Sequence, residues 1–260
     1  MATMEGQRTM FRPAALIGIY NHGSTIASVV EPLRDLELPC YIVDDGSDAA
    51  TKAHLAALSK RFDDIKIWTL PKNSGRGAAL REGFRRLSSE GYSHAIVMDA
   101  DGQHNAKDVP RFLEAARRHP DALVLGSPLF GADAPRARRW GRKISVFWVC
   151  IETLSTAIDD PLCGFRCYPV TGSHQILERG SVGMRMDFDP EMAVRLAWSG
   201  APILNLPTMV RYPIDGISHF RMLRDNARIS WMHTRLVVEM LLRVPKLLGQ
   251  AGVRRIELRP

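Results

Sequence analysis

The first half of the chain alternates short apolar runs with segments of helical periodicity. Apolar runs and helix-like segments follow one another at 14–20, 24–36, 41–43, 51–62, 65–70, 78–87, 95–98, about 108–118 and 122–126. The runs have the length of buried strands, and the segments between them are long enough to be crossover helices. This alternation predicts an α/β fold with a mostly parallel sheet and right-handed crossovers.

The second half of the chain is less regular. Residues 131–143 carry five basic side chains among Gly and Pro, which predicts either a mobile basic loop or a solvated face. We expect a turn entering a strand, a strand edge, a helix, a further strand and a loop, in that order, at 159–168, 185–190, 191–198, 203–210 and 211–220.

The C-terminal segment has the pattern of an amphipathic helix. Between Met222 and Val244 the apolar residues fall on one helical face. That face predicts either packing against the core or contact with anionic lipid. A second segment, 144–158, could also lie on a membrane.

Length and composition fit one globular domain with anionic partners. The 260 residues are enough for one sizeable core, and the formal net charge is +7. A basic balance favours a phosphorylated substrate, an anionic membrane surface or nucleic acid, without choosing among them. No stretch reaches the roughly 20 apolar residues of a spanning helix, and the N-terminus lacks the apolar core of a signal peptide. Because the four cysteines form no disulfide framework, we expect reduced thiols and a cytoplasmic protein.

Two carboxylates directly follow the apolar run at 95–98. Asp99 and Asp101 are one residue apart, and Gln103 and His104 come shortly after them. On an extended segment, side chains at i and i+2 can point the same way. Such a pair offers hard oxygen ligands to a divalent cation that bridges phosphates, and an ordinary Asp-rich turn is the alternative.

Polar residues also end the three preceding strands. Open α/β sheets bind ligands beyond the carboxyl ends of their strands, so we expect these four loops to converge on one edge. An Asp there can accept a hydrogen bond from a base or a ribose, and an Arg can pair with a phosphate. The chain has neither the dinucleotide fingerprint nor a Walker loop. The three earlier loops contribute Tyr20, Asn21, Asp44, Asp45, Asn73 and Arg76.

Seven short motifs are specific as an ordered set, although each is weak alone. They are IYN at 19–21, VDDGSDAAT at 43–51, NSGRGAAL at 73–80, VMDADGQH at 97–104, DPLCGFR at 160–166, FDPEM at 188–192 and RYPIDGISH at 211–219. On these motifs the chain resembles the family 2 glycosyltransferases of the GT-A fold. Within that family it is similar to the polyprenyl-phosphate sugar transferases, such as the dolichol-phosphate mannosyltransferases.

The resemblance covers about 14–220 and implies a site for a UDP- or GDP-linked sugar. It implies a tail at 1–13, a nucleotide-binding half at 14–126, an acceptor half at 127–220 and a helical segment at 221–260. A Mg²⁺ or Mn²⁺ ion would be held by Asp99, Asp101 and Gln103. The residues implied to bind the nucleotide-sugar are Ile19, Tyr20, Asn21, Asp45, Asn73, Arg76, Asp99, Ala100, Asp101, Arg211 and Ser218.

The implied reaction is an inverting transfer to a lipid-linked acceptor such as a polyprenyl phosphate. A lipid phosphate is already ionised near neutral pH, whereas a hydroxyl acceptor would need a carboxylate to take its proton. Asp189, Glu191 and Asp160 are the candidates, with Asp189 preferred, and acids placed to suit a helix start are the alternative. The enzyme would work in the cytoplasm or at the cytoplasmic face of a membrane, without nucleic acid as a partner.

Some residues depart from the family pattern and leave the donor sugar and the acceptor open. Gly18 and Ile19 stand where relatives usually have Pro-Thr, and His219 replaces a frequent lysine. Two remote alternatives remain. A haloacid-dehalogenase-type phosphatase carries a similar Asp-x-Asp motif, but usually on its first strand, and a degenerate transferase could serve only as a binding module.

Overall fold

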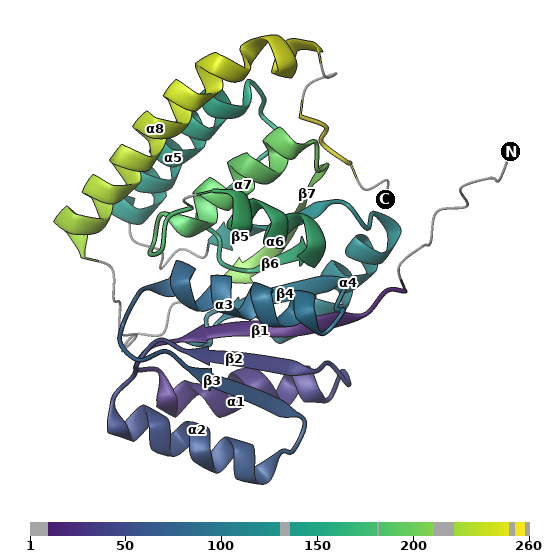
Figure 1. The fold of residues 1–260 in the computed structure, drawn as a ribbon, viewed down its shortest axis with the longest axis vertical. Coiled ribbons are helices and arrows are strands. Elements are labelled where there is room, and N and C mark those ends of the chain that lie inside the picture. The colour runs from purple at the N-terminus through teal and green to yellow at the C-terminus, as the bar shows by residue number, and fades with distance from the viewer. Residues whose placement is uncertain (1–9, 131–135, 181, 211–220, 250–252, 258–260) are drawn as a thin grey trace, which may run out of the picture.

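The computed structural model describes residues 10–130, 136–180, 182–210, 221–249 and 253–257. In these ranges the chain forms a seven-stranded sheet with the order β3-β2-β1-β4-β6-β5-β7 (Figure 1). Neighbouring strands are parallel except β6, which is antiparallel to both β4 and β5. The mostly parallel α/β sheet expected from the sequence is therefore confirmed. The strands are β1 (Pro13–Ile19), β2 (Cys40–Asp44), β3 (Ile65–Thr69), β4 (His94–Asp99), β5 (Leu123–Phe130), β6 (Arg166–Pro169) and β7 (Ile203–Val210).

Two layers of helices cover the sheet. Helices α1, α2 and α4 pack on one face through side chains such as Ile26, Leu55 and Phe112. Helices α3, α6, α7 and α8 pack on the other through side chains such as Phe84 and Met192. The helices are α1 (Gly23–Arg34), α2 (Ala49–Arg61), α3 (Arg76–Ser89), α4 (Val109–Arg118), α5 (Arg136–Thr153), α6 (Val170–Arg179), α7 (Phe188–Ser199) and α8 (Met222–Gly249), with a 3₁₀ turn at Ala106–Asp108.

Burial on both faces explains why the strands are apolar without alternation. In β1, Ile17 lies opposite Ile42 of β2 and Met98 of β4, all in the layer under α1 and α4. The neighbouring residues Leu16 and Val97 face the opposite layer. Strands covered on both faces carry continuous apolar runs, and such runs indicate the strands in the sequence.

Two expectations for the second half are wrong. Residues 185–190 are not a strand edge but a turn and the start of α7, whose first turn contains Pro190 and two acids. Proline and acidic side chains both suit the first turn of a helix. Of the two alternatives for 131–143, a mobile basic loop or a solvated face, the loop is wrong from Arg136 onward, because these residues are part of helix α5. Helix α6 was not expected, and residues 131–135 lie outside the described ranges.

The C-terminal helix α8 lies along α5 (Figure 1). Its side chains Met232, Leu236 and Met240 belong to the core, as the amphipathic pattern predicts. The helix continues past Val244 to Gly249. None of the helices that the structure describes combines the length and the apolar character needed to cross a membrane.

Candidate active site at the carboxyl edge of the sheet

The four polar loops meet at one edge of the sheet, as expected. Strands β3, β2, β1 and β4 are adjacent and parallel, so their carboxyl ends lie together. Two hydrogen bonds link the first two loops. The side-chain oxygen of Asn21 accepts a hydrogen bond from the backbone N–H of Asp48 at 2.9 Å, and the backbone N–H of Asn21 donates to Ser47 Oγ at 3.0 Å. Asn21 has a φ of 54°, in the left-handed region that Asn tolerates better than most residues.

Asp45 joins the loop after β2 to the loop before α3. Its two carboxylate oxygens accept the backbone N–H groups of Ser74 and Gly75, each at 2.7 Å. Burial raises the pKa of Asp45, although these two hydrogen bonds oppose the effect. Gly75 has a φ of 108°, and a Cβ atom there would lie 2.4 Å from the carbonyl oxygen of Met184. The loop before α3 therefore requires glycine at this position.

The structure also describes four further residues expected to bind the nucleotide-sugar, at the ends of β1 and β4 and before α3. Ile19 and Ala100 are buried, and the carbonyl of Ala100 accepts the hydroxyl of Thr25 at 2.6 Å. Tyr20 is half-buried at the end of β1. Asn73 receives a hydrogen bond from Arg185, a residue without a role in the sequence analysis, at 2.9 Å.

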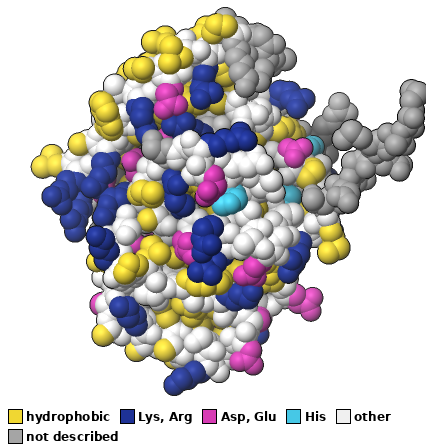
Figure 2. Space-filling view, viewed as in Figure 1, with side chains coloured by type: hydrophobic (Ala, Val, Ile, Leu, Met, Phe, Trp, Pro, Cys, Tyr) yellow, Lys and Arg dark blue, Asp and Glu magenta, His cyan; other side chains and the backbone are white. Residues whose placement is uncertain are grey.

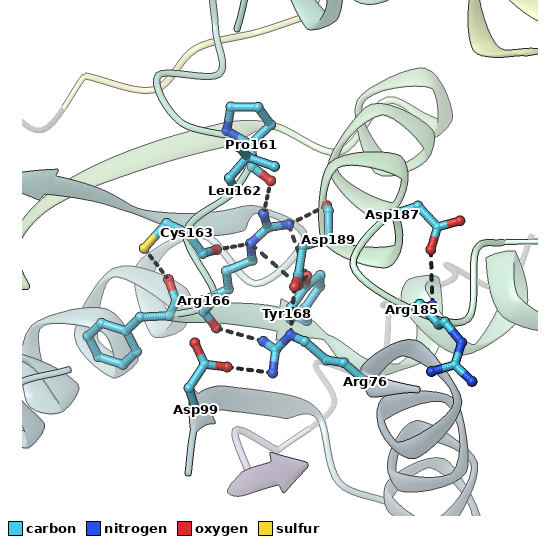
Figure 3. Close-up of polar contacts among 12 residues, drawn as sticks. Arg76, Asp99, Pro161, Leu162, Cys163, Arg166, Tyr168, Arg185, Asp187 and Asp189 are labelled. Carbon is cyan, nitrogen blue, oxygen red and sulfur yellow. Dashed lines mark hydrogen bonds and ion pairs between the residues drawn. The ribbon is translucent and has the colours of Figure 1, made fainter. Parts of the chain in front are cut away.

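Arg76, the first residue of α3, lies between two acids from different elements (Figure 3). Its Nη1 is 2.5 Å from Asp99 Oδ1, and its Nε is 2.7 Å from Asp189 Oδ2. Asp99 ends β4, whereas Asp189 lies in the first turn of α7. Burial raises the pKa of Asp99, but the charge of Arg76 and the hydrogen bond from His104 outweigh it and hold that pKa well below its usual range.

Asp101 is the carboxylate best placed to bind a cation. Its Oδ1 accepts the backbone N–H of Gln103 at 3.0 Å. Burial, and then the nearby charge of Asp99, raises the pKa of Asp101, because both disfavour the ionised carboxylate. His104, which follows closely in the chain, is 3.1 Å from Asp99 Oδ2 through its Nε2.

The donor set fits a divalent cation that arrives with a phosphate ligand. Among the described residues, no three His, Cys, Asp or Glu side chains group closely enough to hold a metal by themselves. Asp99 already contacts Arg76, which leaves Asp101 as the main protein carboxylate. Mg²⁺ commonly binds through one or two carboxylates together with substrate phosphates and waters.

Arg166 is a buried residue of this site that sequence reasoning missed. On β6, its guanidinium donates to the carbonyls of Cys163, Pro161 and Asp189 at 2.7, 2.5 and 2.6 Å (Figure 3). Its Nη1 also donates to Tyr168 at 3.1 Å. Its position in the DPLCGFR motif indicates that Arg166 could belong to the site. The sequence does not show its partners, because they are backbone carbonyls that only the fold brings together. Arg166 fixes the turn before β6 against the start of α7.

The other two candidate acids also contact arginines. Asp160 accepts two hydrogen bonds from Arg142 of α5, at 2.7 and 2.6 Å. Glu191 is fully buried in α7, 2.7 Å from Arg195 and 2.5 Å from Arg235 of α8. Asp189 is therefore the candidate acid that shares an arginine, Arg76, with Asp99. Arg211 and Ser218 lie outside the described residues.

The sheet order, the covering helices and the polar edge define a GT-A fold, the α/β architecture that the sequence motifs implied. The family model described as Glycosyl transferase family 2 matches residues 15–179. The chain therefore belongs to glycosyltransferase family 2.

Relatives in this family include enzymes named for polyprenyl-phosphate sugar transfer. The chain is 31% identical over 118 residues to an undecaprenyl-phosphate mannosyltransferase of Micrococcus luteus, covering 45% of this chain and 48% of that protein. It is 28% identical over 163 residues to a polyprenol monophosphomannose synthase of Mycolicibacterium smegmatis, covering 60% and 61%. The chain thus spans about half to three fifths of the length of these two named relatives. An uncharacterized protein of Methanocaldococcus jannaschii is 26% identical over 218 residues, with 79% and 90% covered.

Solved structures share the fold at low sequence identity. A glucosyl-3-phosphoglycerate synthase of Mycobacterium tuberculosis, in complex with Mn²⁺, UDP-glucose and phosphoglyceric acid, matches with a TM-score of 0.62 and 15% identity, covering 96% of this chain and 90% of that one. A mannosyltransferase of Pyrobaculum calidifontis, in complex with GDP-mannose and Mn²⁺, matches with a TM-score of 0.53 and 13% identity, covering 92% and 75%.

Proposed function

We propose that the protein transfers a sugar, with inversion, from a UDP- or GDP-linked donor to a lipid-linked acceptor such as a polyprenyl phosphate. The observation that carries this proposal is the convergence of Asn21, Asp45, Asp99 and Asp101 on one edge of a GT-A sheet. The names of the two mannosyl-transferring relatives support a polyprenyl-phosphate acceptor. Such an acceptor resides in a membrane, and we place the enzyme at the cytoplasmic face.

The donor would lie along the loops that follow β1, β2 and β4. Asn21 and Asp45 would orient the base and the ribose, while Asp99, Asp101 and Gln103 would face the diphosphate. A Mg²⁺ or Mn²⁺ ion held by Asp101 and Gln103 would offset the negative charge of the departing nucleoside diphosphate. The acceptor phosphate oxygen bonds to the anomeric carbon as the bond from that carbon to the diphosphate oxygen breaks.

The pairing of the candidate acids favours an acceptor that is already ionised. Asp189, Asp160 and Glu191 each contact at least one arginine at 2.7 Å or less. Taking a proton from an acceptor would weaken these ion pairs, so the site is poorly arranged for general-base catalysis by them. A phosphate acceptor requires no such proton transfer.

Transfer to a hydroxyl in glycolipid or polysaccharide synthesis is the alternative. In that reaction a carboxylate must accept the hydroxyl proton. Asp189 is the candidate, because it shares the ion-pair partner Arg76 with Asp99. The two acceptors predict different effects of an Asp189→Asn substitution. Turnover with a lipid phosphate would keep a measurable rate, whereas turnover with a hydroxyl would fall about 100-fold or more, the usual contribution of general-base catalysis.

Nucleoside diphosphate release tests the proposal. The protein would be incubated with Mg²⁺ or Mn²⁺ and a panel of UDP- and GDP-sugars, with and without polyprenyl phosphate. We expect one donor to be turned over faster when the lipid phosphate is present. Release that a soluble glycan stimulates and the lipid does not would favour the hydroxyl acceptor, and failure of every donor and acceptor would refute the proposal.

A further inference from the structure

Helix α5 exposes an apolar stripe to the surface. Trp140, Ile144, Phe147 and Trp148 are spaced at i, i+4, i+7 and i+8, so they lie on one side of the helix. All four are exposed, with Trp140 at 66% and Phe147 at 60%. A surface helix ordinarily presents polar side chains to water.

Helix α8 is apolar on two sides. Its inner side contributes Met232, Leu236 and Met240 to the core. Its outer side exposes Trp231 at 69% and Leu242 at 82%, and the further exposed side chains Met222, Leu223, Val238 and Leu241 lie on the same helix. Packing against the core accounts for the inner side and leaves the outer side unexplained.

The exposed stripes belong to two helices that pack together. His233 of α8 is 2.7 Å from the buried Glu152 of α5, and its ring stacks near Trp148 at 6.4 Å between centroids. Figure 2 shows hydrophobic side chains along the upper left edge, where Figure 1 places α8, and Lys and Arg side chains gathered beside its lower end. We call the exposed side chains of α5 and α8 the α5–α8 face.

These two helices account for the net charge of the whole chain. Their sequences contain ten Lys or Arg and three Asp or Glu, a surplus of seven, equal to the formal net charge of +7 for all 260 residues. The three acids of these helices are buried or already ion-paired. Glu152 is buried, Asp225 pairs with Arg228, and Glu239 pairs with Arg195. The remainder of the chain is neutral.

We infer that the α5–α8 face binds the surface of an anionic lipid bilayer. Exposed Trp, Phe and Leu side chains can insert at the level of the headgroups, and basic side chains attract anionic lipids. In a second copy of this chain, α5 and α8 would carry the same excess of Lys and Arg over acids, so two such faces would repel each other, which opposes dimerisation through this face. This inference deepens the proposed function, because a lipid-linked acceptor resides in the same bilayer.

Bilayer binding through this face would orient the candidate site. Arg142 of α5 contacts Asp160, and Arg235 of α8 contacts Glu191. Both acids lie in motifs that flank the site, and Glu191 is two residues from Asp189. The two helices of this face are thus linked by ion pairs to the motifs that contain Asp160 and Asp189.

Sedimentation with vesicles tests the inference. The full chain would be mixed with phosphatidylcholine vesicles that contain either no anionic lipid or about 30% phosphatidylglycerol, a charge density comparable to a cytoplasmic leaflet. We expect binding to the anionic vesicles and weakening of that binding by salt. Combining Trp231→Ser with Leu242→Ser should reduce the partition coefficient at least about tenfold, because two exposed apolar side chains are lost. The matched control combines Met10→Ser with Leu36→Ser, two exposed apolar residues elsewhere, and should bind as the wild type does.

Three results would overturn the inference. The first is a wild-type protein that fails to sediment with anionic vesicles, and the second is equal loss of binding in the variant and the control. The third is a dimer, detected by light scattering, that the Trp231 and Leu242 substitutions dissociate. The vesicles contain neither polyprenyl phosphate nor nucleotide-sugar, so these results do not depend on whether the proposed transferase activity is correct.

Discussion

Arg76 forms ion pairs with two carboxylates that come from different elements, Asp99 at the end of β4 and Asp189 in α7. Its side chain is 14% exposed, and those of Asp99 and Asp189 are 29% and 8% exposed. Replacing a largely buried arginine leaves its partners as uncompensated charges, which is more damaging than loss of an exposed ion pair. The residue therefore supports both the geometry of the site and the stability of the fold.

An Arg76→Met substitution should destabilise the protein strongly. We expect the free energy of unfolding to fall by about 3–5 kcal/mol, the usual result of removing one partner of a buried ion pair. Urea denaturation measures the change. The control is Arg34→Met, which removes an ion pair to the half-exposed Asp64 and should cost less than about 1 kcal/mol. Similar losses in the two variants would show that Arg76 has no special structural role.

Gly164 leaves room for the Asp99 carboxylate. A Cβ atom at this position would lie 2.4 Å from Asp99 Oδ2 and 2.9 Å from Arg76 Nη2. A Gly164→Ala substitution should displace both side chains and reduce donor turnover about 10- to 100-fold, as small misplacements in a site do. Steady-state kinetics would measure the effect, with Gly172→Ala on α6 as the control, since its Cβ meets only Leu196 at 4.0 Å. Unchanged turnover in the Gly164 variant would contradict this account of the site.

At the scale of elements, a network of ion pairs joins α7 to α8. Glu191 contacts Arg195 and Arg235, and Arg195 also contacts Glu239 at 2.9 Å. Glu191 is fully buried, whereas the Glu239 side chain is 29% exposed. The buried acid is therefore the member on which the attachment of α8 depends most.

A Glu191→Gln substitution should loosen α8 from α7. It removes the charge that compensates two arginines, so we expect a loss of about 3 kcal/mol in the free energy of unfolding. Amide hydrogen exchange should become faster in α8 before it does in β1 or β4. The Glu239→Gln control should change stability by less than about 1 kcal/mol, because that pair is partly exposed. Equal exchange rates in α8 of both variants would argue against the role of Glu191.

The sequence predicted the elements of the first half well because each strand there is covered on both faces. Runs such as 95–98 are continuous and end in polar loops. The sequence therefore predicts both the strands and the carboxylates at their ends. Helix α5 was obscured because Gly131, Pro135 and five basic residues resemble a loop. The start of α7 resembles a strand edge in the sequence because helix periodicity is not visible over its first turn.

The sequence predicts the position of a site residue where its side chain directly follows a strand. It does not predict the position where contacts between distant parts of the chain determine it. Asp99 and Asp101 could be placed from the strand that precedes them. The ion pair from Arg76 to Asp189 joins residues 113 positions apart, and local sequence carries no information on it. The same holds for Arg166, whose partners are backbone carbonyls brought together by the antiparallel insertion of β6.

At the scale of the whole molecule, the candidate site and the α5–α8 face occupy different parts of the fold. The loops of the candidate site lie at the carboxyl edge of the sheet, and the α5–α8 face lies on the helical layer that packs against α7. Arg142 and Arg235 connect the two regions. If the proposed function is correct, this arrangement would place the site for a water-soluble donor beside the surface that we infer to bind lipid, as transfer to a lipid phosphate requires.

Formation of the sugar–phosphate lipid is the most direct test of that account. The wild type and an Asp101→Asn variant would be incubated with donor, divalent cation and polyprenyl phosphate, and the lipid fraction analysed by mass spectrometry. We predict a product heavier than the lipid by one glycosyl group, whose rate of formation falls about 100-fold or more in the variant and is abolished by a chelator. An unmodified lipid in the wild-type reaction, with the same donor transferred to another acceptor, would contradict the account.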